Sequence, residues 1–269
     1  MGPALSPTPH GAPALALVAA LEGEASDLRR RLAMAPERVA GLPGPAYAGL
    51  CGRRPVLLAC SGMGRRRAEE AIEAVLAHRA VLAVVSFGFS GGLQGHLAAG
   101  DLVLASELMG STGPAGEIEP TIYRADRELL GAATEALQTA RLPALCGPTV
   151  TVPGIVATPA GKESLGRWTG AVAVDMESYW LARAASARGL PFLALRAVSD
   201  TMDEPLPPLN QLLDDDGDLS AGRLAAHLVR EPGSLADLLR MARNVGRARR
   251  ALAAGVACAV AELAEKTGP

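Results

Sequence analysis

The sequence has 269 residues, of which 49% are hydrophobic, and its formal net charge is -2 at pH 7. A chain of this length and composition can bury the core of one large or two small domains. Its nearly balanced charge supplies no general positive field, which argues against nucleic acid as the main partner.

The cysteines and histidines are too scattered to form a disulfide framework or a metal site. The four cysteines show no CxxC spacing, and the four histidines lie equally far apart in the sequence. Such a pattern is typical of a reduced, cytoplasmic protein. We therefore expect no metal cofactor, because no His/Cys cluster offers ligands.

The N-terminal residues and two apolar runs indicate where in the cell the protein is expected. Residues 1–13 are rich in Pro and Gly and lack a cationic region, which predicts a disordered leader rather than a signal peptide. The apolar runs at 14–21 and 251–263 are shorter than the roughly 20 residues that span a bilayer. We expect a cytoplasmic protein, with a peripheral contact with the inner face of the membrane as the alternative.

Apolar runs and helical patterns alternate along the chain. Strands are predicted at 14–21, 56–60, 81–87, 101–105, 149–156, 172–174 and 192–198, and helices at 24–33, 65–78, 126–140, 161–167 and 177–189. This alternation predicts an α/β fold, a mostly parallel central sheet with helices on both faces. We assign residues 14–203 to this domain and 204–269 to a helical C-terminal extension of it.

Acidic residues follow three of the predicted strands. Glu24 comes after the first strand, and Glu177 and Asp200 follow two later ones, with Arg196 in the last strand. The carboxyl ends of parallel strands form the ligand-binding edge of such sheets. These acids predict a site there, although an acid at a helix start also favours the positive end of the helix dipole.

Two glycine-rich segments also follow predicted strands, at 61–64 (SGMG) and 88–92 (GFSGG). We expect turns in which backbone N–H groups approach an anion or a sugar hydroxyl. Neither segment matches the dinucleotide fingerprint GxGxxG or a Walker A motif. An ordinary tight turn is the alternative for each.

In their order, these motifs resemble the nucleoside phosphorylase and nucleosidase superfamily. The resemblance rests on SGMG, FGFSGGL with GDLVLAS after it, VDMES at 174–178 and RAVSD at 196–200, and covers residues 14–203. Within the superfamily the chain is most similar to methylthioadenosine/S-adenosylhomocysteine nucleosidases. Its long C-terminal part resembles the hopanoid-associated phosphorylases (HpnG), which remove adenine from adenosylhopane.

The resemblance implies a role for each matching residue. Asp200 would protonate purine N7, Glu24 would hold the attacking water, and Arg196 would lie near that nucleophile. The implied substrate-binding residues are Glu177, Met176, Ser199, Ile155, Val156, Gly88, Phe89 and Ser90. Glu177 would bind the ribose hydroxyls with Met176 under the sugar, and Ile155 and Val156 would contact the base. The resemblance also implies a homo-oligomer.

The sequence departs from the family pattern at two of these positions. Ile155 is aliphatic where an aromatic residue usually stacks on the base. Phe89 stands where a small hydroxyl residue is usual, with Ser90 one place later. These differences predict an altered base wall and nucleophile pocket.

The nucleophile is either water or phosphate. Phosphorylases carry an arginine just before the second glycine-rich segment, where this chain has Ser86. Three arginines follow the first segment at 65–67, and an exposed helical face is their simplest interpretation. With Glu24 present, hydrolysis is favoured, and phosphate stays open as a co-substrate.

Two features of the C-terminal part bear on the substrate. The acidic run at 214–218 lacks the spacing of a calcium-binding EF-hand and is predicted to be a loop. Residues Leu235–Arg250 predict a basic amphipathic helix that either lies on an anionic membrane or packs on the domain.

The combined prediction is an enzyme that cleaves adenine from a 5′-substituted adenosine, with adenosylhopane as the preferred substrate. The alternatives are a methylthioadenosine/S-adenosylhomocysteine nucleosidase, a phosphorolytic purine nucleoside phosphorylase, and a catalytically silent nucleoside-binding protein.

Overall fold

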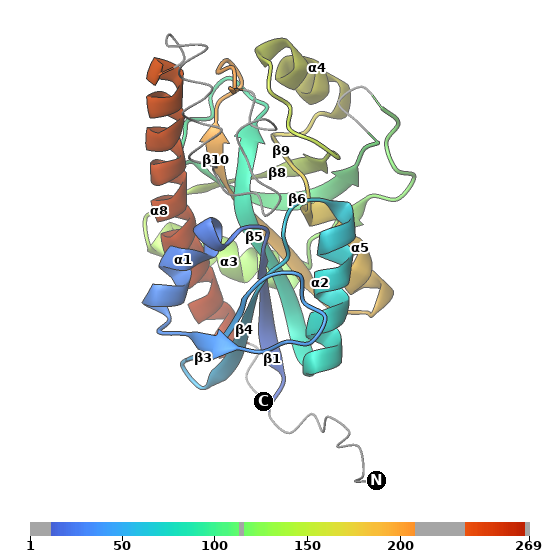
Figure 1. Ribbon diagram of the computed structural model, residues 1–269, viewed down its shortest axis with the longest axis vertical. Helices are drawn as coiled ribbons and strands as arrows, with labels where there is room; N and C mark the ends of the chain where they lie inside the picture. Colours follow the sequence, from blue (N-terminus) through green and yellow to red (C-terminus); the bar gives the residue numbers. More distant parts are fainter. Residues whose placement is uncertain (1–11, 113–115, 208–234, 267–269) are drawn as a thin grey trace.

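A computed structural model describes residues 12–112, 116–207 and 235–266 (Figure 1). The acidic run at 214–218 and all but the last two residues of the predicted leader lie outside these ranges. Figure 1 shows one twisted sheet with helices on both sides. The predicted α/β class is confirmed.

The described strands form a single hydrogen-bonded sheet. They are β1 (Ala14–Ala19), β2 (Ala35–Glu37), β3 (Ala46–Cys51), β4 (Arg54–Cys60), β5 (Val81–Gly92), β6 (Leu102–Gly110), β7 (Tyr123–Arg124), β8 (Ala144–Thr151), β9 (Ala173–Asp175) and β10 (Phe192–Asp200). Their order is β10-β6-β8-β9-β5-β1-β4-β3-β2, with β7 beside β6. The run β4-β1-β5-β10 is parallel, whereas β2, β3 and β7 join antiparallel.

β5 also pairs with β10, which closes β5, β10, β6, β8 and β9 into a ring. The first half of β5 lies between β1 and β10, and its last two residues pair with β9. One long strand therefore belongs both to the open sheet and to the ring.

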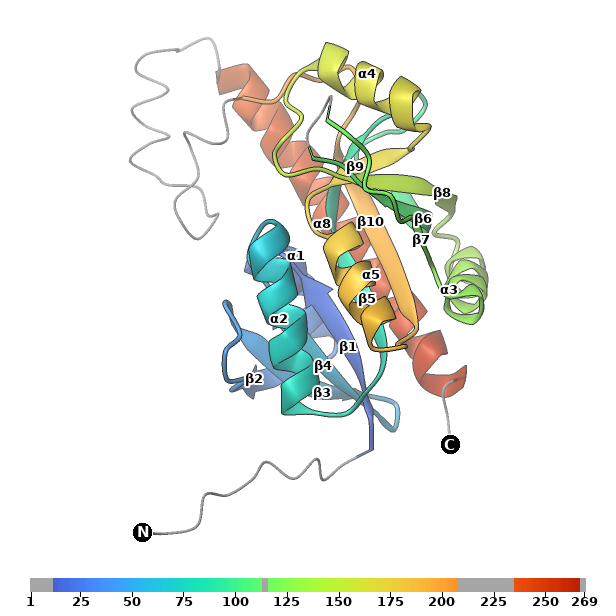
Figure 2. The ribbon, with the colours of Figure 1, turned by 90° about the vertical axis from the view of Figure 1, so that its right-hand side faces the viewer.

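Helices cover the two faces of the open sheet unequally. They are α1 (Glu22–Arg31), α2 (Arg65–His78), α3 (Arg127–Thr139), α4 (Pro159–Thr169), α5 (Ser178–Ala187) and α8 (Leu235–Lys266). α1, α3 and α8 pack on one face and α2 and α5 on the other (Figure 2). α4 lies across the ring, where Leu165 packs against residues of β8 and β9.

The strand side chains explain the apolar runs of the sequence. In β1, Leu15 and Leu17 point to the face of α1 and α8, and Ala16 and Val18 to the face of α2 and α5. Because both faces are covered, every residue of the strand is buried and no polar alternation appears. Each buried Leu or Val contributes about 1.5–3 kcal/mol of hydrophobic stabilisation.

Two helices begin where local capping chemistry dictates. The side chain of Asp126 accepts from the backbone N–H groups of Glu128 and Leu129 at the start of α3. Thr158 caps α4, with Pro159 at the first helical position, so this helix begins two residues before the predicted 161. α1 likewise begins at Glu22 instead of 24.

Several strand predictions are corrected. Residues 88–92 are part of β5 and not a turn, because Gly88 and Ser90 pair with Arg196 and Val198 of β10. β8 spans Ala144–Thr151, whereas a strand was predicted at 149–156; Pro153 and Gly154 lie beyond its end. β2 and β3 were not predicted.

α8 is one continuous helix of 32 residues. The apolar run at 251–263 is its buried half, whose residues join the core with α1 and α3. In the other half Leu238 is buried while Leu235 and Leu239 are 50% and 48% exposed, so not all of its apolar side chains pack on the domain. No helix in the described ranges is long and apolar enough to cross a membrane.

Candidate active site

The three acids singled out in the sequence line one pocket. Glu24 lies in the first turn of α1, Glu177 immediately precedes α5, and Asp200 is the last residue of β10. All three side chains face the same pocket although they come from distant parts of the chain. Each is less than 9% exposed, so their charges are largely removed from water.

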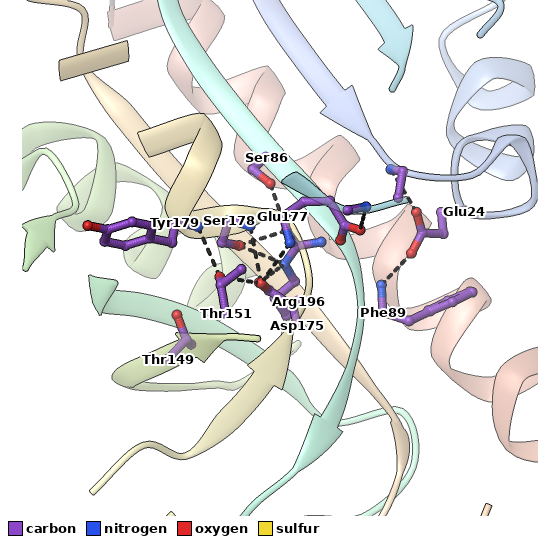
Figure 3. Close-up of polar contacts among 12 residues, drawn as sticks. Glu24, Ser86, Phe89, Thr149, Thr151, Asp175, Glu177, Ser178, Tyr179 and Arg196 are labelled. Atoms are coloured by element: carbon purple, nitrogen blue, oxygen red, sulfur yellow. Dashed lines mark hydrogen bonds and ion pairs between the residues drawn. The ribbon is translucent and has the colours of Figure 1, made fainter. Parts of the chain in front are cut away.

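Backbone N–H groups hold the carboxylate of Glu24. Its Oε2 accepts from Ala20 N (3.0 Å) and Leu21 N (2.9 Å), and its Oε1 accepts from Phe89 N (2.7 Å) (Figure 3). Burial raises the pKa of Glu24, while these N–H groups and Arg196 act in the opposite direction. The result is a carboxyl group held in place by three backbone N–H groups, with a pKa raised from its ordinary value.

Arg196 lies behind the pocket in a buried polar cluster. Its Nε is 2.9 Å from Asp175 Oδ2, and its Nη2 donates to Ser86 Oγ (2.8 Å) and Ser178 Oγ (2.6 Å) (Figure 3). Asp175 Oδ1 in turn accepts from Thr151 Oγ1 at 2.6 Å. The guanidinium is therefore occupied by protein groups and does not line the pocket.

Gly88 explains how Arg196 and Glu24 can lie so close together. A Cβ at this position would be 2.7 Å from Glu24 Oε1 and closer still to Arg196 Nη1. Any side chain would thus push the two groups apart. The glycine does not line the pocket; it leaves open the space between the carboxylate and the guanidinium.

Glu177 carries a second carboxyl group of the site with a strongly raised pKa. Its Oε1 accepts from Gly64 N at 2.8 Å. Burial, and after it the charge of Asp175, raises the pKa of Glu177 to about 8. The side chain is therefore mostly protonated at pH 7 and can both donate to and accept from a sugar hydroxyl.

The first glycine-rich segment is a turn, as predicted, and it contacts a protein carboxyl group. Gly62 and Gly64 have φ of 76° and 87°, conformations that favour glycine. The N–H of Gly64 donates to Glu177, which lies 113 residues further along the chain. The arginines that follow point elsewhere: Arg65 and Arg66 pair with glutamates one turn on along α2.

Asp200 has a cationic partner that the sequence reasoning missed. Lys162 of α4 is fully buried, and its Nζ lies 2.6 Å from Asp200 Oδ2. Ser199 Oγ donates to the other carboxylate oxygen of Asp200 at 2.7 Å. Only its rarity distinguishes it in the sequence: Lys162 is one of two lysines among 26 lysine and arginine residues, and no neighbouring motif points to its partner.

The remaining pocket wall is mostly apolar. Its apolar side chains are those of Leu21, Met63, Phe89, Val152, Ile155, Val156, Val174, Met176 and Leu206. The hydroxyl of Ser90 also reaches the wall, buried and without a hydrogen-bond partner among the described residues. Such an unpaired group normally awaits a ligand or water. All the predicted site residues except Gly88 and Arg196 line the pocket.

Comparisons with known proteins agree with this architecture. Residues 14–230 match the Phosphorylase superfamily. The 5′-methylthioadenosine/S-adenosylhomocysteine nucleosidase of Geobacillus kaustophilus (strain HTA426) is 32% identical over 206 residues, 70% of this chain and 85% of that protein.

Two solved structures share the fold. The 5′-methylthioadenosine/S-adenosylhomocysteine nucleosidase of Neisseria meningitidis is 22% identical, with a TM-score of 0.71 over 95% of this chain and 100% of its own. The futalosine hydrolase of Helicobacter pylori strain 26695 is 17% identical, with a TM-score of 0.73 over 92% and 97%. With its fold, its pocket and the match over most of its length, the chain belongs to the phosphorylase superfamily.

Proposed function

We propose that the protein hydrolyses the N-glycosidic bond of a 5′-substituted adenosine and releases adenine. The observation that carries this proposal is the convergence of Glu24, Glu177 and Asp200 on one pocket with an apolar wall. The curated relative from Geobacillus kaustophilus, a nucleosidase by name, supports the same reaction class.

Each carboxyl group has a distinct task in this reaction. Cleavage builds positive charge on the ribose and negative charge on the purine. Asp200 contacts the purine and delivers a proton to N7, which turns adenine into a better leaving group. Glu177 binds the ribose hydroxyls, and Glu24 accepts the proton of the attacking water.

The same contacts favour water over phosphate as the nucleophile. Three backbone N–H groups that could cradle an anion donate to Glu24 instead. The guanidinium of Arg196 is bonded to Asp175, Ser86 and Ser178. A phosphate dianion beside Glu24 would meet a like charge, and the described residues that line the pocket include no lysine or arginine to offset it.

The test of the reaction is adenine release from methylthioadenosine and from adenosylhopane, with and without phosphate. Hydrolysis predicts adenine and the free sugar at a rate independent of phosphate. Phosphate-dependent release with a sugar 1-phosphate product would make the protein a phosphorylase. Absence of release from every nucleoside would leave a catalytically silent binding protein. Asp200→Asn should lower turnover of the active substrate about 10²-fold or more.

The preferred substrate in this proposal is adenosylhopane, with methylthioadenosine and S-adenosylhomocysteine as the alternatives. The resemblance of the C-terminal part to the hopanoid-associated phosphorylases supports the lipid nucleoside, as does the apolar wall of the pocket, which includes Leu206. Initial rates with adenosylhopane in mixed micelles against methylthioadenosine decide between them. A higher kcat/KM for methylthioadenosine would favour the hydrophilic substrate.

A lipid substrate also gives the exposed face of α8 a role at an anionic membrane. Leu235 and Leu239 are about half exposed, and Arg243, Arg247 and Arg250 are exposed further along the same helix. Apolar and cationic side chains on one helix suit binding to anionic lipid. Vesicles containing phosphatidylglycerol should sediment the protein at low salt, and replacing the three arginines with glutamine should abolish this.

The matched control replaces Arg65 and Arg66, two exposed arginines of α2 that pair with neighbouring glutamates. This variant should sediment with the same vesicles as the wild type does. Equal loss of binding in both variants would point to general charge and not to α8.

We also propose a homo-oligomer, as the family resemblance implies, which light scattering of the purified protein measures.

A further inference from the structure

A lysine is bonded to the acid at the base side of the pocket. Lys162 is the only cation within ion-pair distance of Asp200 among the described residues, at 2.6 Å, and neither side chain is more than 11% exposed. A buried ion pair is by itself weak support for stability, because desolvation offsets much of the attraction. Its position against the reacting purine suggests a chemical role.

The surroundings of Lys162 fit an ammonium group. Its Nζ donates to the carbonyl oxygens of Thr201 (2.7 Å) and Glu204 (3.0 Å) as well as to Asp200. Three acceptors thus converge on one atom that has three N–H bonds. The planar fork of an arginine does not match this arrangement, which accounts for a lysine here in a chain whose cations are nearly all arginines.

The neighbouring charges leave Asp200 as the carboxylate partner of Lys162. The carboxylate of Glu204 accepts from Thr201 N and Asn244 Nδ2 and pairs with Arg240 of α8. The other charged groups that face the pair are Asp203 in the same loop, Asp237 in α8, and Glu24 and Glu177 across the pocket. Lys162 and Asp200 therefore form an ion pair of opposite formal charges, joined at 2.6 Å.

We propose that Lys162 is a positioning residue that supplies, through Asp200, the proton taken up by purine N7. This inference rests on the proposed nucleosidase function and adds the source of the proton. As the bond between N9 and C1′ breaks, its electron pair moves into the purine. The Lys162 ammonium passes a proton to the Asp200 carboxylate, Asp200 passes a proton to N7, and adenine leaves neutral.

The remaining steps balance the reaction. The oxygen of water bonds to C1′, and the proton that this water loses passes to Glu24. Lys162 is left as a neutral amine and regains a proton from solvent once adenine has departed, while Glu24 returns its proton to solvent. A bare Asp200 carboxylate would instead have to collect a proton from solvent before each turnover.

The experiment compares Lys162→Met with wild type over pH 5 to 8.5, using whichever nucleoside the wild type cleaves. Glu177, whose pKa is about 8, is present in both proteins, so the readout is the kcat of Lys162→Met relative to that of wild type at each pH. This ratio should fall about tenfold for each pH unit above neutrality, with a loss of about 10²-fold near pH 7.5 that shrinks towards pH 5. A loss of the same size at every pH would show a purely structural role and overturn the proposal.

A second substrate distinguishes a lost proton supply in Lys162→Met from a general distortion of its pocket. The 4-nitrophenyl riboside has a leaving group that needs no proton, so Lys162→Met should cleave it at no less than one third of the wild-type rate. Loss of both activities together would contradict the proposal. Lys266→Met, which removes the other lysine at an exposed ion pair with Glu135, is the control and should behave as wild type.

The double variant Lys162→Met with Asp200→Asn covers the case in which the single variant does not fold. It places two neutral side chains of similar size in the buried site. Because Lys162 acts through Asp200, the double variant should be no slower than Asp200→Asn alone. An additional tenfold loss would refute the coupling. If the wild type released no adenine, the proposed function would fail first, independently of these variants.

Discussion

Glu177→Gln is expected to stabilise the protein while impairing its activity. Burial and Asp175 raise the pKa of Glu177 from an ordinary 4.5 to about 8. A raised carboxyl pKa contributes stability that is complete below the unfolded pKa and is lost as pH rises through the folded one. Glutamine keeps an oxygen that accepts from Gly64 N and has no proton to lose. The stability of the Glu177→Gln protein therefore lacks this dependence on pH.

The magnitude follows from these two pKa values. The unfolded chain ionises above pH 4.5 and the folded one above about pH 8. Each pH unit between them weakens the folded wild type by about 1.4 kcal/mol, so the penalty is about 3 kcal/mol at pH 7 and about 5 kcal/mol above pH 8. Glutamine should remove this penalty and leave stability near pH 4.5 unchanged.

Urea unfolding of both proteins at several pH values from 5 to 8 measures the effect. The stability difference should grow with pH and favour Glu177→Gln. A difference that stays constant between pH 5 and pH 8 would refute the reasoning. Glu163→Gln, which removes an exposed carboxylate from α4, is the matched control and reports the effect of one lost surface charge. Adenine release, measured in parallel, should fall in Glu177→Gln because the ribose loses its carboxyl partner.

Four further substitutions test the site and the fold. Gly88→Ala should lower kcat about 10²-fold, because its Cβ would displace both Glu24 Oε1 and Arg196 Nη1; near-normal turnover would contradict the close contact. The raised pKa of Glu24 predicts that wild-type activity falls on the acidic side at a higher pH than an ordinary carboxyl group would cause. Glu24→Gln should remove this acidic limb of the pH–rate profile. An unchanged limb would mean that another residue causes it. Gly131→Ala, in open space on α3, should raise stability by about 1 kcal/mol in thermal unfolding, whereas Gly166→Ala, whose Cβ would lie 2.8 Å from a backbone oxygen, should lower it.

The sequence predicted the features that depend on local patterns. Fully apolar runs identified the buried parallel strands, and the rule that acids gather at strand ends brought together Glu24, Glu177 and Asp200, which the structure places in one pocket. The helix of residues 65–78 was predicted with its observed ends. The chemical roles of these acids stay predictions until the variants are measured.

The features that were missed depend on long-range pairing. Residues 88–92 look like a turn because glycine has a low intrinsic strand preference, yet the ladder with β10 keeps them extended. Lys162 has no local signal for its role, since two of its three acceptors are carbonyl oxygens about 40 residues further on. β2 and β3 were missed because proline and glycine interrupt residues 35–55.

Because β5 belongs to both the open sheet and the ring, its register determines whether the active site can form. Gly88 lies opposite Arg196, and Ser90 opposite Val198, in one continuous ladder. Sliding β5 by a single residue would turn each of its side chains to the other face and fill the vacant space beside Glu24. A misregistered molecule would thus be inert even if its hydrophobic interior were rebuilt. Natural selection for enzymatic activity would therefore also select for the correct register of β5 in the sheet.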